Sequence, residues 1–189
     1  MSRILTLASQ SPRRKQLLEM LGLPIRVEPA NIPEQPLPRE TPLAYSKRLA
    51  REKCRAVPGE YVLGADTIVV LDDHLLEKPT DVEDAVRMLT LLQGRTHEVI
   101  SSVALAHRGN ETVLTDITKV TFLPADEATL RAYVATGEPM DKAGAYGIQG
   151  YGAALIEKID GDFFGVMGLP VRLVLELLAE AGWPYRFKG

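Results

Sequence analysis

Three stretches of this sequence carry residues whose types and spacing could do chemistry, and the first is a group of cations at a helix start. Ser11 and Pro12 are typical of a helix cap and a first helical position, and Arg13, Arg14 and Lys15 follow directly. A helix N-terminus already carries partial positive charge and normally attracts Asp or Glu. Cations beside its exposed N–H groups become favourable when an anion binds there. The stretch indicates a phosphate site, with a solvated basic helix start as an equal alternative.

The second stretch places one carboxylate inside a run that is otherwise typical of a buried strand. Residues 61–71 are almost continuously apolar, as in a central strand buried on both faces, and Asp66 interrupts them. A buried carboxylate is costly unless it is paired or binds a cation. We therefore expect Asp66 to be a catalytic or metal-binding residue at an irregularity of the strand. The alternative is a structural aspartate at a bend near Gly64.

The third stretch is a glycine-rich loop at residues 137–152. Glycines allow a backbone to approach a ligand closely and to adopt positive φ. Tyr146 and Gln149 have the chemistry to contact a nucleotide base, by stacking and through an amide. A plain flexible loop is the alternative. The mixture of aromatic, amide and charged side chains favours a binding loop.

Length, composition and charge limit the class of protein. A chain of 189 residues that is 46% hydrophobic is large enough for one globular domain, residues 1–189, or one domain with two lobes. The net charge of −3 argues against a general nucleic-acid or membrane-surface binder, so an anion site must be a local pocket. Cys54 is the only cysteine, which excludes an internal disulfide. With no signal segment or membrane-spanning run visible, we expect a cytoplasmic protein.

Strands and helices alternate along the chain and must position these residues. The pattern predicts strands at 4–8, 25–28, 61–71, 75–76, 97–107, 112–123 and 154–159, and helices at 12–21, 41–56, 80–94, 126–135 and from 168 onward. A proline-rich loop at 29–38 contains Glu34. Thr80 and Glu83 have capping-box spacing, and Val82 and Ile117 are among the expected core residues.

The three stretches together resemble the signatures of the Maf family, nucleoside triphosphate pyrophosphatases once named for septum formation. The matching motifs are Leu7-Ala8-Ser9-x-Ser11-Pro12-Arg13-Arg14, Val62-Leu63-Gly64-Ala65-Asp66-Thr67 and the run from Thr136 to Gly150. The match runs in order from about residue 5 to 178. The chain contains neither a P-loop motif nor a dinucleotide-binding fingerprint, so the sequence does not support a nucleotide site of either of those two types.

The resemblance implies a fold and a reaction. The fold is α/β, an elongated mixed β-sheet with flanking helices and two lobes around a central cleft, as in inosine triphosphate pyrophosphatases. The reaction converts a nucleoside triphosphate and water into a nucleoside monophosphate and pyrophosphate, with a divalent cation of the Mg²⁺ or Mn²⁺ type. The resemblance also implies a homodimer, and from the composition we expect neither a nucleic-acid nor a membrane partner.

Three positions distinguish branches of the family. Arg13, Thr67 and Gln149 resemble the branch that acts on dTTP and UTP, whereas the branch that acts on 7-methyl-GTP has Trp, Gln and Glu there. A neutral amide can pair with the imide edge of a pyrimidine, whereas a cationic methylated purine suits an aromatic ring and a carboxylate. The alternatives are the 7-methyl-GTP activity and a non-catalytic nucleotide sensor acting on septum formation.

The resemblance also implies which residues handle the triphosphate. Arg13, Arg14, Lys53 and Lys78 are expected to hold the phosphates and to neutralise charge on the departing pyrophosphate. Ser9 and the N–H groups of the helix start add hydrogen bonds. Thr67 and Gln149 are expected to contact the base.

The metal and the attacking water are expected at two carboxylates. Asp66 and Glu34 position the cation, and Asp66 is the expected general base. Asn31 and Pro33 stand where the family commonly has acids, which implies a lower metal affinity or a larger share for Glu34. Lys142 assists near the phosphates or forms a structural pair with the neighbouring aspartate.

Overall fold

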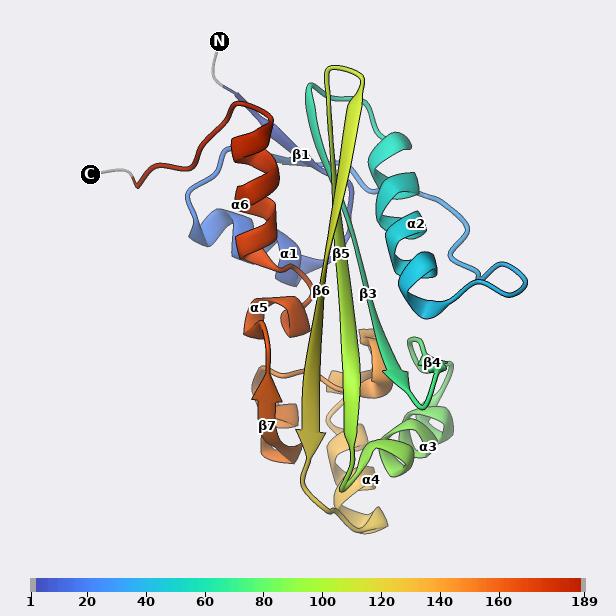
Figure 1. The fold of residues 1–189 in the computed structure, drawn as a ribbon. Helices are drawn as coiled ribbons and strands as arrows, with labels where there is room; N and C mark the ends of the chain where they lie inside the picture. The colour runs from blue at the N-terminus through green and yellow to red at the C-terminus, as the bar shows by residue number, and fades with distance from the viewer. Residues whose placement is uncertain (1–2, 188–189) are drawn as a thin grey trace. The chain divides into compact units, whose positions relative to one another are not determined.

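A mixed sheet of seven strands forms the frame of the protein in the computed structural model, which describes residues 3–187 (Figure 1). Its order is β2-β1-β3-β5-β6-β7, and β4 pairs with β3 outside this path. β1 runs parallel to β2 and β3, whereas the pairs β3–β4 and β6–β7 are antiparallel. The strands are β1 (Leu5–Leu7), β2 (Ile25–Val27), β3 (Tyr61–Leu71), β4 (His74–Leu76), β5 (Thr96–His107), β6 (Asn110–Phe122) and β7 (Ile156–Asp160). The expectation of an α/β fold with a mixed sheet is confirmed.

Except for α5 (Phe163–Met167), which the sequence does not predict, the helices occupy the predicted intervals, with most ends within about two residues. They are α1 (Pro12–Met20), α2 (Pro42–Arg55), α3 (Val82–Leu92), α4 (Glu127–Ala135), α5 (Phe163–Met167) and α6 (Val171–Glu180). Three short 3₁₀ segments lie in the glycine-rich loop: Glu138–Asp141, Ala143–Ala145 and Gly150–Leu155. Ser11 and Thr41 cap α1 and α2 by accepting a hydrogen bond from a backbone N–H of the first turn, as their residue types predict.

The chain separates into two compact units, and three strands contribute to both. The first unit comprises residues 1–66, 101–116 and 168–189, and the second comprises 67–100 and 117–167. The boundaries fall within β3, β5 and β6. The assignment of residues 1–189 to a single domain stays a prediction.

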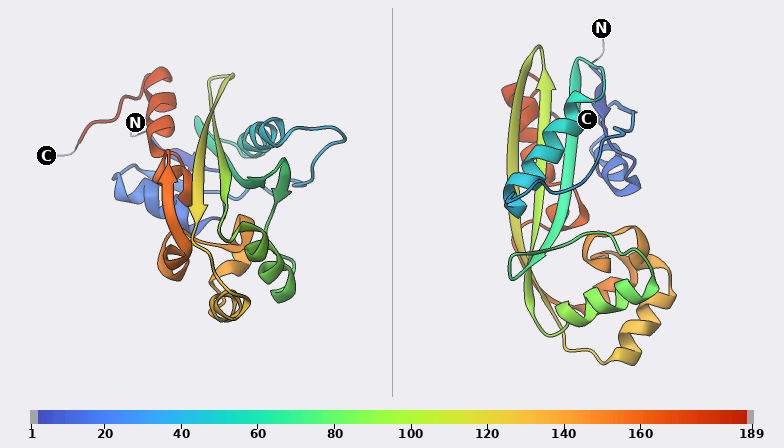
Figure 2. Two further views of the ribbon diagram at one scale, coloured as in Figure 1. Left: turned by 60° about the horizontal axis from the view of Figure 1, so that its bottom comes forward. Right: turned by 90° about the vertical axis from the view of Figure 1, so that its right-hand side faces the viewer.

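Each unit has its own apolar packing. In the first unit, Ala8, which directly follows β1, packs with small side chains of α2 and β3, among them Ala50 and Val62. In the second unit, α3 and α4 pack against each other (Figure 2), and Leu89 and Leu130 are fully buried there. Cys54 is a buried free thiol.

Two details of the core differ from the sequence prediction. Asp81, not Thr80, caps α3, because its carboxylate accepts a hydrogen bond from Asp84 N at 2.8 Å. Val82 is therefore the first helical residue and is 53% exposed rather than buried. Ile117 is also exposed, because Thr118 and the alternate residues after it face the core and set the phase of β6.

No helix within residues 3–187 is long and apolar enough to cross a membrane.

His97 lies in the core of the second unit and makes stability there sensitive to acid. It is 2% exposed, its Nε2 is 2.8 Å from the Tyr146 hydroxyl, and burial lowers its pKa to about 4. An unfolded chain keeps a histidine pKa of about 6.5 and so binds more protons between these two values. The free energy of unfolding therefore falls as the pH drops from about 6.5 to about 4, by a total of about 3 kcal/mol at most.

We predict that His97→Gln removes this part of the pH dependence, because an amide does not titrate in this range. Urea unfolding from pH 4 to 7 measures it, with His74→Gln, at an exposed position, as the control. The same slope in His97→Gln and the unaltered protein would contradict the assignment.

Candidate active site

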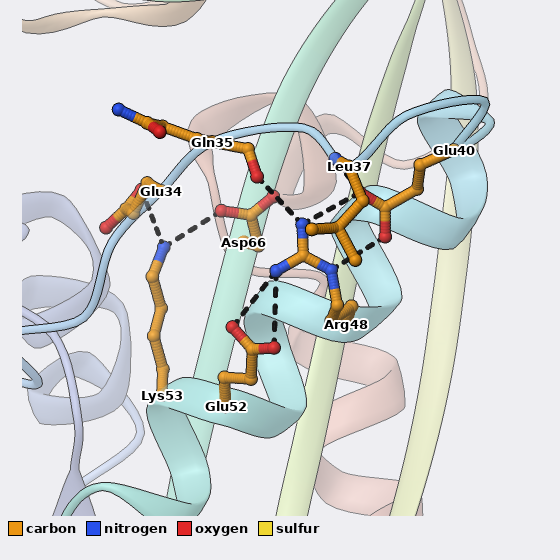
Figure 3. Close-up of polar contacts among 8 residues, drawn as sticks. All are labelled: Glu34, Gln35, Leu37, Glu40, Arg48, Glu52, Lys53 and Asp66. Atoms are coloured by element: carbon orange, nitrogen blue, oxygen red, sulfur yellow. Dashed lines mark hydrogen bonds and ion pairs between the residues drawn. The ribbon is translucent and has the colours of Figure 1, made fainter.

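A buried ion pair between α2 and β3 forms the centre of the candidate site. Lys53 Nζ lies 2.9 Å from Asp66 Oδ1, and the two side chains are only 8% and 6% exposed. The same ammonium lies 3.1 Å from Glu34 Oε2, which belongs to the proline-rich loop (Figure 3). Lys53 thus bridges the two carboxylates that the sequence singles out, and all three residues belong to the first unit.

The second oxygen of Asp66 is the exceptional atom of this centre. Asp66 Oδ2 is buried and has no hydrogen-bond partner among the described residues. Buried carboxylate oxygens are nearly always satisfied, because leaving one unpaired costs free energy. Asp66 therefore presents an acceptor position suited to a water, a proton or a cation.

Gly64 allows the Lys53–Asp66 pair to form. A Cβ at this position would lie 2.1 Å from Ala50 O and 2.7 Å from Cys54 N, both in the backbone of α2. The missing side chain therefore lets the helix that carries Lys53 lie directly against β3. β3 runs as one strand from Tyr61 to Leu71, and the glycine serves helix packing, while the expected irregularity at Asp66 stays a prediction.

Arg14 and Ser9 meet where β1 leads into α1. Arg14 Nη1 donates to Ser9 Oγ at 3.0 Å and to Ala65 O at 2.9 Å, and Nε donates to Gly168 O at 2.8 Å. Ser9 Oγ also accepts from Ser11 N at 3.2 Å. One guanidinium therefore links the β1–α1 turn, the strand residue before Asp66 and the start of the C-terminal segment.

Charge and burial compete at Arg14. Burial lowers the pKa of the Arg14 guanidinium, while the negative charges of Asp66 and Glu34 oppose this shift. Arg13, the residue before Arg14 in the same helix turn, is half-buried. The first unit thus gathers five of the expected site residues around Asp66 without any bound molecule: Ser9, Arg14, Glu34, Lys53 and Asp66 itself.

The remaining expected residues belong to the second unit. Thr67 follows Asp66 on β3 and is half-buried, whereas Lys78 and Gln149 are exposed. Lys142 Nζ donates to Glu138 O and lies 2.6 Å from Asp141 Oδ1. Of the two roles expected for Lys142, the structure contains the pair with its neighbour.

The glycine-rich loop is organised by a residue that the sequence reasoning missed. The Glu138 carboxylate accepts hydrogen bonds from Tyr133 Oη, Tyr151 N and Gly152 N, each at 2.9 Å. Gly152 is needed because a Cβ there would lie 2.1 Å from Gly147 O. A carboxylate beside several glycine N–H groups was the available signal.

Tyr146 belongs to the core and not to a base-stacking surface. It is 5% exposed, and its ring packs edge-on against Phe122 and His97 with centroids 4.8 and 5.3 Å apart. The expectation that Tyr146 stacks on a base is therefore wrong, because its hydroxyl and its ring serve internal packing. Gln149 keeps its exposed position at the end of the same run.

Within residues 3–187, no group of three or more His, Cys, Asp or Glu side chains is arranged to hold a metal ion. The candidate site supplies two carboxylates, the buried Asp66 and the half-exposed Glu34, and the ammonium of Lys53 lies between them.

Comparison with known proteins identifies the family to which the chain belongs. The Maf-like protein family model matches residues 4–181, and the chain belongs to this family. A dTTP/UTP pyrophosphatase of Koribacter versatilis is 49% identical over 182 residues, covering 94% of each chain. Proteins of the same name from Anaeromyxobacter dehalogenans and Symbiobacterium thermophilum are 48% and 47% identical over 184 residues, covering 95% of each chain. The family resemblance inferred from the motifs is confirmed.

We predict that Gly64→Ala destabilises the protein by about 3 kcal/mol, because the added methyl group must push α2 away from β3. Gly109→Ala is the comparison. Gly109 has a φ of +81°, and a Cβ added there would meet no atom within 4 Å. Alanine at that position therefore costs only the strain of a left-handed residue, about 1 kcal/mol. Chemical denaturation of both variants measures the difference. Equal losses would show that α2 does not depend on the close approach at Gly64.

Proposed function

We propose that this protein hydrolyses dTTP and UTP to the nucleoside monophosphate and pyrophosphate. The observation that carries the proposal is the buried Lys53–Asp66 pair, which leaves one carboxylate oxygen without a partner among the described residues. The names of relatives with 47–50% identity support the choice of substrate.

The chemistry requires an attacking water and a neutralised leaving group. In the proposed reaction, Asp66 takes a proton from water as the oxygen attacks the α-phosphorus, and the bond to the β-phosphate oxygen breaks. Lys53 orients the Asp66 carboxylate, because its ammonium lies 2.9 Å from Oδ1. Arg13, Arg14 and Lys78 add positive charge for the triphosphate and the departing pyrophosphate.

A divalent cation of the Mg²⁺ or Mn²⁺ type fits this donor set. Mg²⁺ is commonly bound by one or two carboxylates together with substrate phosphates and waters. Asp66 and Glu34 supply two carboxylates, and Oδ2 of Asp66 is a buried oxygen suited to a cation. A bound ion would supply charge stabilisation at the phosphates. We therefore propose that the ion arrives with the triphosphate, since two carboxylates alone make a weak site.

Selection of the nucleotide is proposed for Arg13, Thr67 and Gln149. Gln149 is exposed, as a residue that contacts a base must be, and its amide can pair with the imide edge of thymine or uracil. Ser9 is proposed to add a hydrogen bond to phosphate, and Lys142 to assist from the glycine-rich loop.

The cellular setting is also a proposal. Removal of unwanted pyrimidine triphosphates from the nucleotide pool requires a cytoplasmic enzyme, and a link to arrest of cell division follows if the pool limits septum formation. We propose a homodimer that uses no nucleic acid, and the net charge of −3 supports the absence of nucleic-acid binding.

A turnover assay tests the proposal. We predict pyrophosphate release from dTTP and UTP but little from 7-methyl-GTP, with Mg²⁺ or Mn²⁺ present. Asp66→Asn should lower kcat by at least about 100-fold, because an amide cannot accept the proton. Asp126→Asn, at the exposed cap of α4, is the matched control and should retain full turnover.

Three outcomes would overturn the proposal. Preference for 7-methyl-GTP would assign the other branch of the family. Tight nucleotide binding without turnover would identify a sensor. Full activity of a folded Asp66→Asn protein would remove Asp66 from the reaction.

A further inference from the structure

We propose that Arg48 is a positioning residue, which holds the proline-rich loop on α2 so that the Glu34 carboxylate stays at Lys53 and Asp66. The kinetic part of this inference rests on the proposed function. The geometric part concerns residues 29–40 and α2 alone, and it can be tested without any substrate.

The loop has little structure of its own. Residues 28–41 connect β2 to α2 without a helix or a strand. Its one tight turn is closed by Leu37 and Glu40: Glu40 N donates to Leu37 O at 3.0 Å, and Leu37 N donates to Glu40 Oε2 at 2.9 Å. A segment of this kind keeps one conformation only where other elements hold it.

Arg48 holds this turn through a two-point ion pair. Its Nε and Nη2 each lie 2.7 Å from an oxygen of Glu40, so the guanidinium and the carboxylate face each other as two forks (Figure 3). The Glu40 side chain is 8% exposed and that of Arg48 is 22% exposed. Hydrogen bonds from Arg48 lower the pKa of Glu40, so the pair stays ionised in neutral solution. Paired geometry of this kind fixes orientation as well as distance.

The same guanidinium also reaches the residue next to Glu34. Arg48 Nη2 donates to Gln35 O at 2.9 Å, and Nη1 donates to both carboxylate oxygens of Glu52 at 3.1 and 3.2 Å. Glu52, one residue before Lys53 on α2, thereby keeps the Arg48 side chain extended toward the loop. One side chain thus connects the backbone beside Glu34 to the helix that carries Lys53.

The contact that Glu34 makes by itself is weaker. Its side chain is 47% exposed, and its ion pair with Lys53 spans 3.1 Å. A half-exposed ion pair contributes little to holding a loop, because solvent screens the charges and the side chain loses freedom. The partly buried, two-point pair of Arg48 with Glu40 therefore fixes the loop, and this fixed backbone holds Glu34 beside Lys53 and Asp66.

The test compares Arg48→Lys and Glu40→Gln with a matched pair elsewhere on α2. Lysine keeps the positive charge but cannot form the two-point pair, and glutamine keeps the shape of the glutamate but loses its charge. Arg55 forms the same two-point pair with Glu111, at 2.7 and 2.9 Å, but Glu111 lies on β6 and not on the loop. Arg55→Lys is therefore the control for the loss of a two-point arginine–carboxylate pair on this helix.

Amide hydrogen exchange of the full chain is the first measurement. We expect faster exchange at residues 35–40 in Arg48→Lys and Glu40→Gln, because the Leu37 N–H and its turn lose their support. We expect no change there in Arg55→Lys. Unchanged exchange in both loop variants would overturn the proposal, and this result does not depend on whether the protein hydrolyses a nucleotide.

Kinetics of the combined variants is the second measurement. We expect Arg48→Lys to lower kcat for dTTP by about 10- to 100-fold, as for residues that orient a metal-binding group, and to raise the half-saturating metal concentration. In a Glu34→Gln background the same substitution should cost nothing further, because Arg48 acts through Glu34. Multiplied losses, or an equal loss in Arg55→Lys, would overturn the proposal. If Arg48→Lys fails to fold, Glu40→Gln carries the same comparison.

Discussion

The ion pair between Lys53 and Asp66 is the interaction on which the site depends. Two nearly buried charges lose most of their hydration, and their mutual attraction offsets this cost only when the geometry is good. Here the Nζ–Oδ1 distance is 2.9 Å, yet the other carboxylate oxygen has no partner among the described residues. A protein evolved for stability alone gains little from such an arrangement. A site that must accept a water and a cation beside a carboxylate gains a fixed, charged acceptor.

The surrounding residues bring Lys53 and Asp66 together and fix the orientation of their side chains. Gly64 removes the side chain that would separate α2 from β3. Arg14, at the start of α1, donates a hydrogen bond to the carbonyl oxygen of Ala65, the residue before Asp66. Arg48 donates hydrogen bonds to Gln35 O and to the Glu40 carboxylate, in the loop that carries Glu34. Each of these contacts joins segments distant in the sequence, so the site is a product of the packing of the first unit.

Local chemistry made much of the fold predictable. Ser11, Thr41 and the following prolines marked two helix starts, and the apolar run at 61–71 gave β3 with the bounds that the structure has. Asp66 stood out because a carboxylate inside such a run requires a partner. Glu34 was expected beside Asp66 as a metal ligand, whereas Lys53 was expected at the phosphates, and its pair with Asp66 came from the structure.

Long-range contacts were outside the reach of sequence reasoning. Nothing local shows that Arg48 pairs with Glu40, that Glu138 organises the glycine-rich loop, or that Tyr146 is a core residue. These facts depend on which elements meet in the folded chain. Val82 was wrongly expected in the core because the cap of α3 is Asp81 and not Thr80. A shift of the cap by one residue changes which side of the helix its first residues face.

In the proposed reaction, water attacks the α-phosphorus of a pyrimidine triphosphate beside Asp66. Hydrolysis of dTTP in ¹⁸O-labelled water, followed by mass spectrometry of both products, tests it most directly. We expect one labelled oxygen in the monophosphate and unlabelled pyrophosphate. Label in the pyrophosphate, or release of inorganic phosphate with a nucleoside diphosphate, would contradict it.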